Sequence, residues 1–183
     1  MSRVGADRPG ATGAPPPDAV VGRGRRIRQM VAVALVVVGA DQVTKSLAVS
    51  RLSSGAVHLI GPFSLSLSYN TGVAFSIGTG LGLPIVLVVV VIVALVAWFG
   101  RTVPNLVAAT ALGMILGGAI GNLADRLLRG HHGAVVDFIY SGFWPTFNLA
   151  DASIVCGCVL LAISLYRKSP QAGSPGRNGE AAR

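Results

Sequence analysis

The strongest constraint on this chain is the apolar run of residues 83–100, which from Pro84 onward has the sequence PIVLVVVVIVALVAWFG. A run of this length is long enough to cross a bilayer as a helix. Residues 27–49, 106–127 and 147–166 form three more apolar segments. Only 12% of the residues are charged, whereas about one quarter are charged in a soluble domain. We therefore expect an all-α polytopic membrane protein with four transmembrane helices.

The first apolar segment has two alternative interpretations. The basic stretch before residues 31–40 resembles the start of a secretory signal peptide, and Arg25–Arg26 resembles a weak twin-arginine signal. However, the helical pattern continues through Lys45 and Leu47 without a convincing small-x-small cleavage site. This continuation favours a retained transmembrane helix.

Residues 51–79 do not form a spanning segment. Within them, apolar and hydroxyl side chains alternate from Phe63 to Tyr69, which is the pattern of a strand with one apolar face. Because such backbone cannot face lipid with its polar groups unpaired, it should lie at a membrane surface. We expect residues 57–69 to form a small β-like cradle on the extracytoplasmic side.

Positive charge predicts the topology. Of the 15 Lys and Arg residues, six lie in residues 1–29, four in residues 167–183, and one is Arg101 in the turn after the second span. With four spans these segments share one side, which the positive-inside rule makes cytoplasmic. We expect residues 1–26 and 169–183 to be disordered cytoplasmic tails around a transmembrane domain of residues 27–168. Basic flanks of this kind do not indicate nucleic-acid binding.

The third apolar segment carries Gly113, Gly117 and Gly121 at intervals of four residues. Such a stripe of small residues lets helix backbones approach each other closely in a bilayer. We interpret it as a packing surface rather than as a functional site.

Four aspartates lie inside this apolar body, and the topology brings all of them to the extracytoplasmic end: Asp41, Asp125, Asp137 and Asp151. A carboxylate in the membrane interior costs roughly 2.5–3.5 kcal/mol, so each needs a partner or a function. Asp41 and Lys45, four residues apart, are placed to form an ion pair. Asp125 can pair with Arg126 or with Lys45 across the bundle, and we expect it to be mainly structural.

Asp137 and Asp151 have no such obvious partner. Asp137 lies between apolar residues, a setting that raises a carboxyl pKa by desolvation. Asp151 follows Asn148 by three residues, so one alternative for it is simple capping of the fourth helix. As a pair, the two carboxyls could instead share a proton and activate a water between them, as in aspartic peptidases.

No metal or organic cofactor is expected. Cys156 and Cys158 are two residues apart on a predicted helix, so they point to different faces. His131 and His132 lie in a loop without suitable further ligands nearby, and a direct catalytic role for them is the less favoured interpretation.

Five segments together resemble the lipoprotein signal peptidases (signal peptidase II), which are bacterial aspartic peptidases with four transmembrane helices. The segments are DQVTK at 41–45, YNTGVAFS at 69–76, GGAIGNLADR at 117–126, VVDF at 135–138 and FNLADAS at 147–153. The resemblance covers nearly all of residues 30–166. Two departures are the longer N-terminal tail and the RGHHGA sequence at 129–134, which affects how the loop places Asp137.

The resemblance implies a function and a set of site residues. The family removes signal peptides from prolipoproteins, cutting just before a cysteine that carries a diacylglyceryl group. Its catalytic pair corresponds to Asp137 and Asp151. Its supporting polar residues correspond to Asp41, Lys45, Asn70, Asn122, Asp125, Arg126 and Asn148. It also implies a multi-pass protein of the bacterial cytoplasmic membrane that acts on a lipidated prolipoprotein among membrane lipids, and we expect a monomer.

One alternative belongs to another class of protein. Small bundles with buried acids can be proton- or ion-coupled transporters, or subunits of a larger complex. A transporter would place its acids near the bilayer midplane within paired repeats. Here the acids are predicted at one face and no internal repeat is visible, so the peptidase is favoured.

Overall fold

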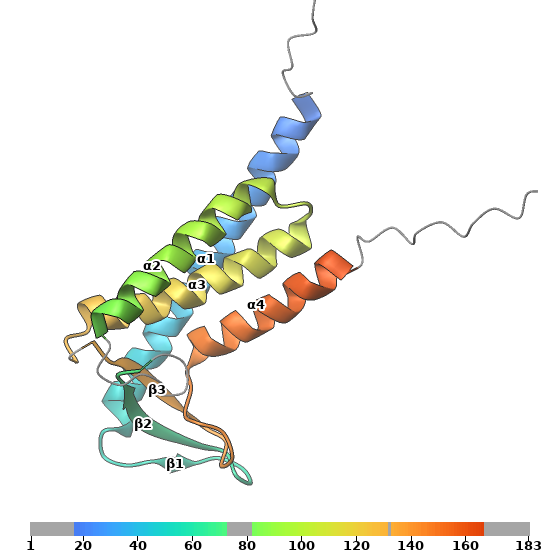
Figure 1. Ribbon diagram of the computed structural model, residues 1–183. Helices are drawn as coiled ribbons and strands as arrows, with labels where there is room; N and C mark the ends of the chain where they lie inside the picture. Colours follow the sequence, from blue (N-terminus) through green and yellow to red (C-terminus); the bar gives the residue numbers. More distant parts are fainter. Residues whose placement is uncertain (1–16, 73–81, 132, 167–183) are drawn as a thin grey trace, which may run out of the picture.

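The computed structural model describes residues 17–72, 82–131 and 133–166. Its helices are α1 (Pro17–Leu52), α2 (Gly82–Phe99), α3 (Leu106–Leu128) and α4 (Leu149–Tyr166), with a short 3-10 turn at Gly100–Thr102 between α2 and α3. The four helices run beside one another, and a small sheet lies at one end of the bundle (Figure 1). Because α3 contacts each of the other three helices, it is the central element.

Three helices within the described residues are long and apolar enough to cross a membrane: α1 from Gly22, α3 and α4. The prediction of a membrane protein is therefore confirmed, and the structure is mostly helical with a small antiparallel sheet. The fourth span was predicted at residues 83–100, where the structure has the 18-residue helix α2. Its crossing of the membrane stays a prediction.

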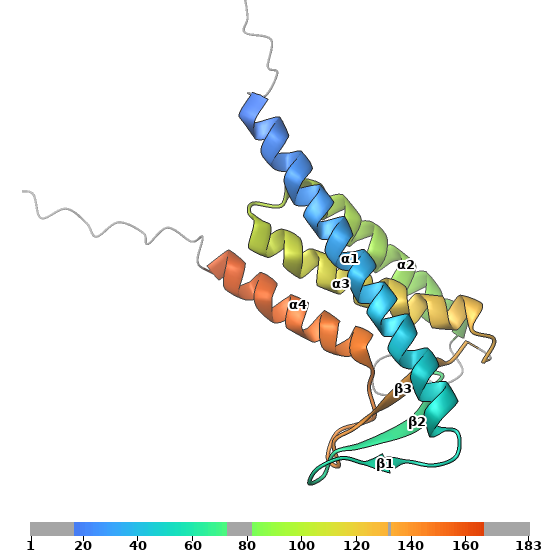
Figure 2. The same ribbon diagram turned by 180° about the vertical axis from the view of Figure 1, so that it is seen from behind.

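Helix α1 differs from the prediction at its N-terminal end. Residues 1–26 were predicted to be disordered, but residues 17–26 are helical and continue into the spanning segment. Proline is favoured at the first position of a helix, as at Pro17, and extending an existing helix avoids the cost of nucleation. The N-terminal end of α1 therefore projects beyond the bundle, away from the sheet (Figure 2). The remaining parts of the two predicted tails, residues 1–16 and 169–183, lie outside the described residues.

Glycines on α3 allow its neighbours to approach closely. A Cβ at Gly117 would lie 2.8 Å from the carbonyl oxygen of Ala34 on α1, and one at Gly118 would lie 2.5 Å from that of Ala150 on α4. Real Cβ atoms do not make such contacts, so any larger residue would push the helices apart. The predicted packing role of the glycine stripe is confirmed.

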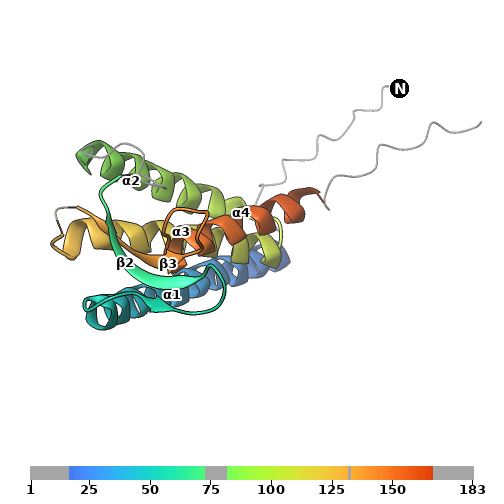
Figure 3. The same cartoon turned by 90° about the horizontal axis from the view of Figure 1, so that it is seen from below.

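The sheet is antiparallel, in the order β1 (Val57–His58), β2 (Ser64–Asn70) and β3 (Val135–Tyr140). Strand β2 corresponds to the predicted alternating segment, and it runs across the bundle end from α1 toward α2 (Figure 3). Strand β3 was not predicted, because the aspartate at its centre interrupts the pattern of its β-branched and aromatic residues.

The sheet packs against the end of α1. Ala48 and Leu52 of α1 form a buried cluster with Phe138 of β3, and Leu65 and Leu67 of β2 pack against that cluster. Since β2 and β3 pair with Ser68 opposite Asp137, this packing holds Asp137 at the end of the bundle where α3 ends and α4 begins.

Candidate active site

Asp137 lies on β3 with its carboxyl almost fully buried. Asn70 Nδ2 from β2 donates a hydrogen bond to its Oδ2 at 3.1 Å, and Asn148 Nδ2 donates to its Oδ1 at 2.7 Å. Burial, followed by the nearby charge of Asp151, raises the pKa of Asp137 to about 6, although the two amide hydrogen bonds oppose the rise. This carboxyl can therefore hold a proton much closer to neutral pH than an ordinary aspartate.

Asp151 lies in the first turn of α4, and it caps the helix together with Asn148. The backbone N–H of Asn148 donates to Asp151 Oδ2 at 3.2 Å, and the N–H of Asp151 donates to Asn148 Oδ1 at 3.0 Å. The capping alternative is thus correct as geometry. However, Asp151 Oδ1 also accepts a hydrogen bond of 2.8 Å from Asn122 Nδ2 of α3, so the carboxylate has a second role.

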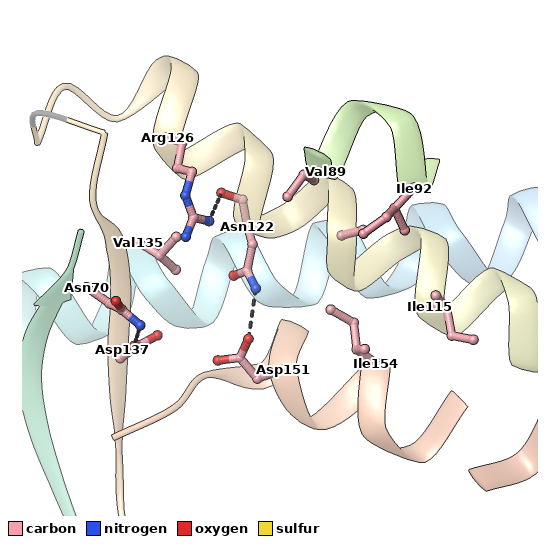
Figure 4. Close-up of a pocket in the computed structure, with 11 residues that line it drawn as sticks. Asn70, Val89, Ile92, Ile115, Asn122, Arg126, Val135, Asp137, Asp151 and Ile154 are labelled. Atoms are coloured by element: carbon pink, nitrogen blue, oxygen red, sulfur yellow. Dashed lines mark hydrogen bonds between the residues drawn. The ribbon is translucent and has the colours of Figure 1, made fainter. Parts of the chain in front are cut away.

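Both aspartates line one cavity of about 250 Å³ between α2, α3, α4 and the sheet (Figure 4). Two asparagines link them, because Asn148 Nδ2 donates to Asn122 Oδ1 at 3.1 Å as well as to Asp137. The sequence prediction that these two carboxyls converge is therefore met by the fold, although they are 14 residues apart and come from different elements.

The rest of the cavity wall is of two kinds. Val89, Ile92, Ile115 and Ile154 supply an apolar part contributed by α2, α3 and α4. On the polar side, Arg126 donates hydrogen bonds to the carbonyl oxygens of Gly72 and Asn122. Its Nε is buried and has no hydrogen-bond partner among the described residues, so it is a donor available to a bound molecule.

This arrangement can perform general acid–base chemistry. A carboxyl whose pKa is raised by burial lies in the same cavity as one in the first turn of a helix. Such different surroundings can give two identical groups opposite proton roles. Within the described residues, no cluster of three or more His, Cys, Asp or Glu side chains is placed to hold a metal ion.

The predicted ion pair between Asp41 and Lys45 is confirmed, with an Nζ–Oδ2 distance of 2.8 Å. Lys45 also pairs with Asp125 across the bundle at 3.1 Å, as one of the two predicted alternatives proposed. The other alternative, Arg126, is wrong: Arg126 follows Asp125 directly on the helix and points to the cavity, and Arg129 one turn later pairs with Asp125 at 2.9 Å.

The family model described as "Signal peptidase (SPase) II" matches residues 33–167, which is more than half of the sequence and includes both aspartates. The chain belongs to the signal peptidase II family.

Curated members of the signal peptidase II family support this assignment. The chain is 43% identical over 147 residues to the lipoprotein signal peptidase of Mycobacterium tuberculosis strain H37Rv, covering 76% of this chain and 71% of that protein. It is also 43% identical over 157 residues to that of Rhodococcus jostii, covering 83% and 78%. No comparison supports the alternative that the chain is a transporter.

Solved structures with the same fold agree. A bacterial membrane enzyme determined by the in meso method at 2.3 Å superposes with a TM-score of 0.71 and 27% identity, covering 80% of this chain and 93% of that chain. A second, at 1.9 Å, gives a TM-score of 0.67 and 28% identity, covering 76% and 94%.

Sequence reasoning missed two polar residues of this signal peptidase II chain. Gln42 bridges Asp41 and Asp125, and Arg129 donates to Asp125 and to Gln42. The four-residue spacing of Arg129 from Asp125 was a visible signal. His131 packs against Tyr69 with the two rings tilted by 46° and their centroids 4.5 Å apart, and it does not line the cavity. His132 and residues 73–76 of the YNTGVAFS segment lie outside the described residues.

Proposed function

We propose that this chain is an aspartic endopeptidase that removes signal peptides from diacylglyceryl-modified prolipoproteins, cutting just before the lipidated cysteine. The observation that carries the proposal is the presence of Asp137 and Asp151 in one cavity of a signal peptidase II member. The resemblance assigns these two aspartates as the catalytic pair. The curated relatives are named lipoprotein signal peptidases, which supports the substrate class.

In this mechanism Asp137 is the acid and Asp151 is the base. The protonated Asp137 donates its proton to the oxygen of the scissile carbonyl, while Asp151 takes a proton from the attacking water. The water oxygen forms a bond with the carbonyl carbon, which gives a tetrahedral intermediate with two hydroxyl groups. The C–N bond then breaks as Asp151 returns its proton to the leaving amide nitrogen and Asp137 takes back a proton from one hydroxyl group, so that both carboxyls regain their starting states. The raised pKa of Asp137 supports its role as the acid. The position of Asp151 in the first turn of α4, where the helix dipole favours a negative charge, supports its role as the base.

Substrate entering the cavity would raise the pKa of Asp137 further. A bound peptide displaces water, and desolvation already is the largest cause of the raised pKa of this carboxyl. Because the two carboxyls supply both acid and base, we propose that no metal takes part. A chelator should therefore leave turnover unchanged.

The remaining wall of the cavity suggests how the substrate is held. The apolar side chains of Val89, Ile92, Ile115 and Ile154 suit an acyl chain or an apolar peptide segment. Arg126 Nε and the amides of Asn70, Asn122 and Asn148 offer polar groups for an extended backbone or a lipid head group. A single chain provides all of these groups, so a monomer suffices.

We also propose four membrane crossings, with α2 as the fourth span beside the three found. Its 18 residues give a length of about 27 Å, close to the thickness of a bilayer core. Four crossings put both termini and Arg101 on the cytoplasmic side of a bacterial cell membrane, as the basic residues favour. The sheet and both aspartates then lie near the extracytoplasmic face.

The substrate proposal is tested with two synthetic precursor peptides that differ only in the cysteine, which carries a diacylglyceryl group in one and is free in the other. Purified protein in detergent should cleave the first peptide immediately before the cysteine, as determined by mass spectrometry, and leave the second intact. Equal cleavage of both peptides, or cleavage at another bond, would contradict the proposal.

A further inference from the structure

The backbone amides just before the two aspartates are held by two other carboxylates. The N–H of Val136, which precedes Asp137, donates to Asp125 Oδ2 at 3.0 Å. The N–H of Ala150, which precedes Asp151, donates to Asp41 Oδ1 at 3.0 Å. Each catalytic aspartate is therefore held to a membrane helix through the backbone N–H of the residue before it. Asp137 is held in this way to α3, and Asp151 to α1.

One ammonium group joins these two attachments. Lys45 Nζ lies 2.8 Å from Asp41 Oδ2 and 3.1 Å from Asp125 Oδ2. Its third contact, at 2.9 Å, is with Asn122 Oδ1. An ammonium has three donors, and here each of them has a partner. Lys45, Asp41 and Asp125 are all fully buried.

The contact between Lys45 and Asn122 also connects Lys45 to the active site. Asn122, oriented by Lys45, donates through Nδ2 to Asp151 Oδ1. Asn148 Nδ2 donates both to Asn122 Oδ1 and to Asp137 Oδ1, so Lys45 is connected to each of the two aspartates by two routes. Lys45, Asp41 and Asp125 do not line the cavity, so none of them is placed to touch a substrate.

We propose that Lys45 is a positioning residue that sets the separation of Asp137 and Asp151, by locking together the two carboxylates that hold their preceding amides. This inference rests on the proposed function, in which these two aspartates are the catalysts. It goes beyond a structural ion pair, because it predicts that a single side chain controls the backbone at two places 14 residues apart.

Two physical arguments favour positioning over stability. Buried ion pairs can often be replaced by apolar residues without loss of stability, so their presence alone does not indicate a stabilising role. In contrast, a displacement of about 1 Å in a catalytic group can cost roughly 10²-fold in rate. A rigid ammonium with three fixed partners restrains such displacements on both sides of the cavity.

The test compares Lys45→Met, which keeps an unbranched side chain one heavy atom shorter and removes the charge, with Val43→Ala, an exposed position on the same helix. Hydrogen exchange at the amides of Val136 and Ala150 is measured together with the kinetics. For Lys45→Met we expect faster exchange at both amides and little change elsewhere. We also expect kcat to fall about 10²-fold with KM nearly unchanged, and Val43→Ala to behave as the original protein.

A second variant keeps the proposal testable if Lys45→Met does not fold. Asp41→Ala leaves Lys45 paired with Asp125, so the buried charge is still compensated. Exchange should then become faster at Ala150 and stay unchanged at Val136. The proposal is overturned if Lys45→Met accelerates exchange throughout the helices while kcat per folded molecule is retained. It is also overturned if kcat falls without faster exchange at either amide.

Failure of this inference can be distinguished from failure of the proposed function. The exchange measurement needs no substrate, so it tests the attachments even if the protein does not cleave a lipidated precursor. Conversely, normal exchange and normal kcat in Lys45→Met would reject the positioning role and leave the peptidase assignment intact.

Discussion

Asn148 and Asp151 hydrogen-bond to each other twice, with the backbone N–H of each residue donating to the side chain of the other. This reciprocal pair begins α4, and the remaining side-chain N–H groups of Asn148 reach Asp137 and Asn122. One asparagine therefore begins the helix that carries one aspartate and orients the carboxyl of the other.

We expect Asn148→Ala to impair both stability and turnover. Loss of the cap should cost about 1 kcal/mol, and loss of the hydrogen bond to Asp137 should lower kcat on the order of 10²-fold. Thermal unfolding and single-turnover cleavage in detergent measure the two effects. A variant with an unchanged kcat would show that the orientation of Asp137 does not depend on Asn148.

Close packing at Gly121 predicts a second effect. A Cβ there would lie 2.6 Å from Asp41 Oδ2, whereas one at Gly39 of α1 would have nothing within 4 Å. Gly121→Ala should therefore cost about 1–3 kcal/mol by overpacking and reduce turnover by displacing Asp41. Gly39→Ala is the control and should be neutral or slightly stabilising. Equal melting temperatures and rates for the two variants would contradict this packing.

The raised pKa of Asp137 predicts how stability depends on pH. The folded protein binds this proton more tightly than the unfolded chain, because the pKa of Asp137 rises from the ordinary aspartate value of 3.8 to about 6. The associated stability is fully present below pH 3.8 and is lost as the pH rises through about 6. The shift corresponds to roughly 3 kcal/mol.

In Asp137→Asn the pH-dependent stability that the protonation of Asp137 contributes should disappear. Its free energy of unfolding should fall less between pH 4 and pH 7 than that of the original protein, as measured by denaturation in detergent at each of these pH values. Parallel pH profiles for the two proteins would mean that Asp137 has an ordinary pKa in the folded state.

The apolar wall of the cavity predicts an effect on binding. Ile92 lines the cavity and is partly exposed, so a larger side chain there would occupy space in the cavity. Ile92→Trp should raise KM for a lipidated precursor several-fold with a smaller effect on kcat, because it removes binding space away from the carboxyls. Val91→Trp, at the exposed neighbouring position outside the cavity, should leave KM unchanged. If both variants raise KM equally, the cavity does not hold the substrate.

The sequence predicted the elements that depend on local periodicity. The bounds of α3 and α4 lie within two residues of those predicted, and the alternation from Phe63 to Tyr69 located β2. Strand β3 was missed because six residues that contain an aspartate give no clear period. Its partner β2 lies more than sixty residues earlier in the chain, and single-sequence patterns carry no information on such pairing.

The prediction of the active site from sequence has the same limit. Spacing predicted the pair Asp41–Lys45, since both residues lie on one helix face. It could not show that Gln42 reaches Asp125, or that Asp41 and Asp125 accept the amides of Ala150 and Val136, because these contacts depend on which helix faces meet. Capping and catalysis were treated as alternatives for Asp151, but the geometry allows both.

The most direct measurement is turnover of a diacylglyceryl-modified precursor by purified Asp137→Asn and Asp151→Asn, expressed per folded molecule and compared with Val43→Ala. Each aspartate variant should lose at least about 10³-fold in kcat, since it removes the acid or the base, while Val43→Ala should keep the original rate. Full turnover by both aspartate variants would contradict the proposal that this chain is an aspartic peptidase.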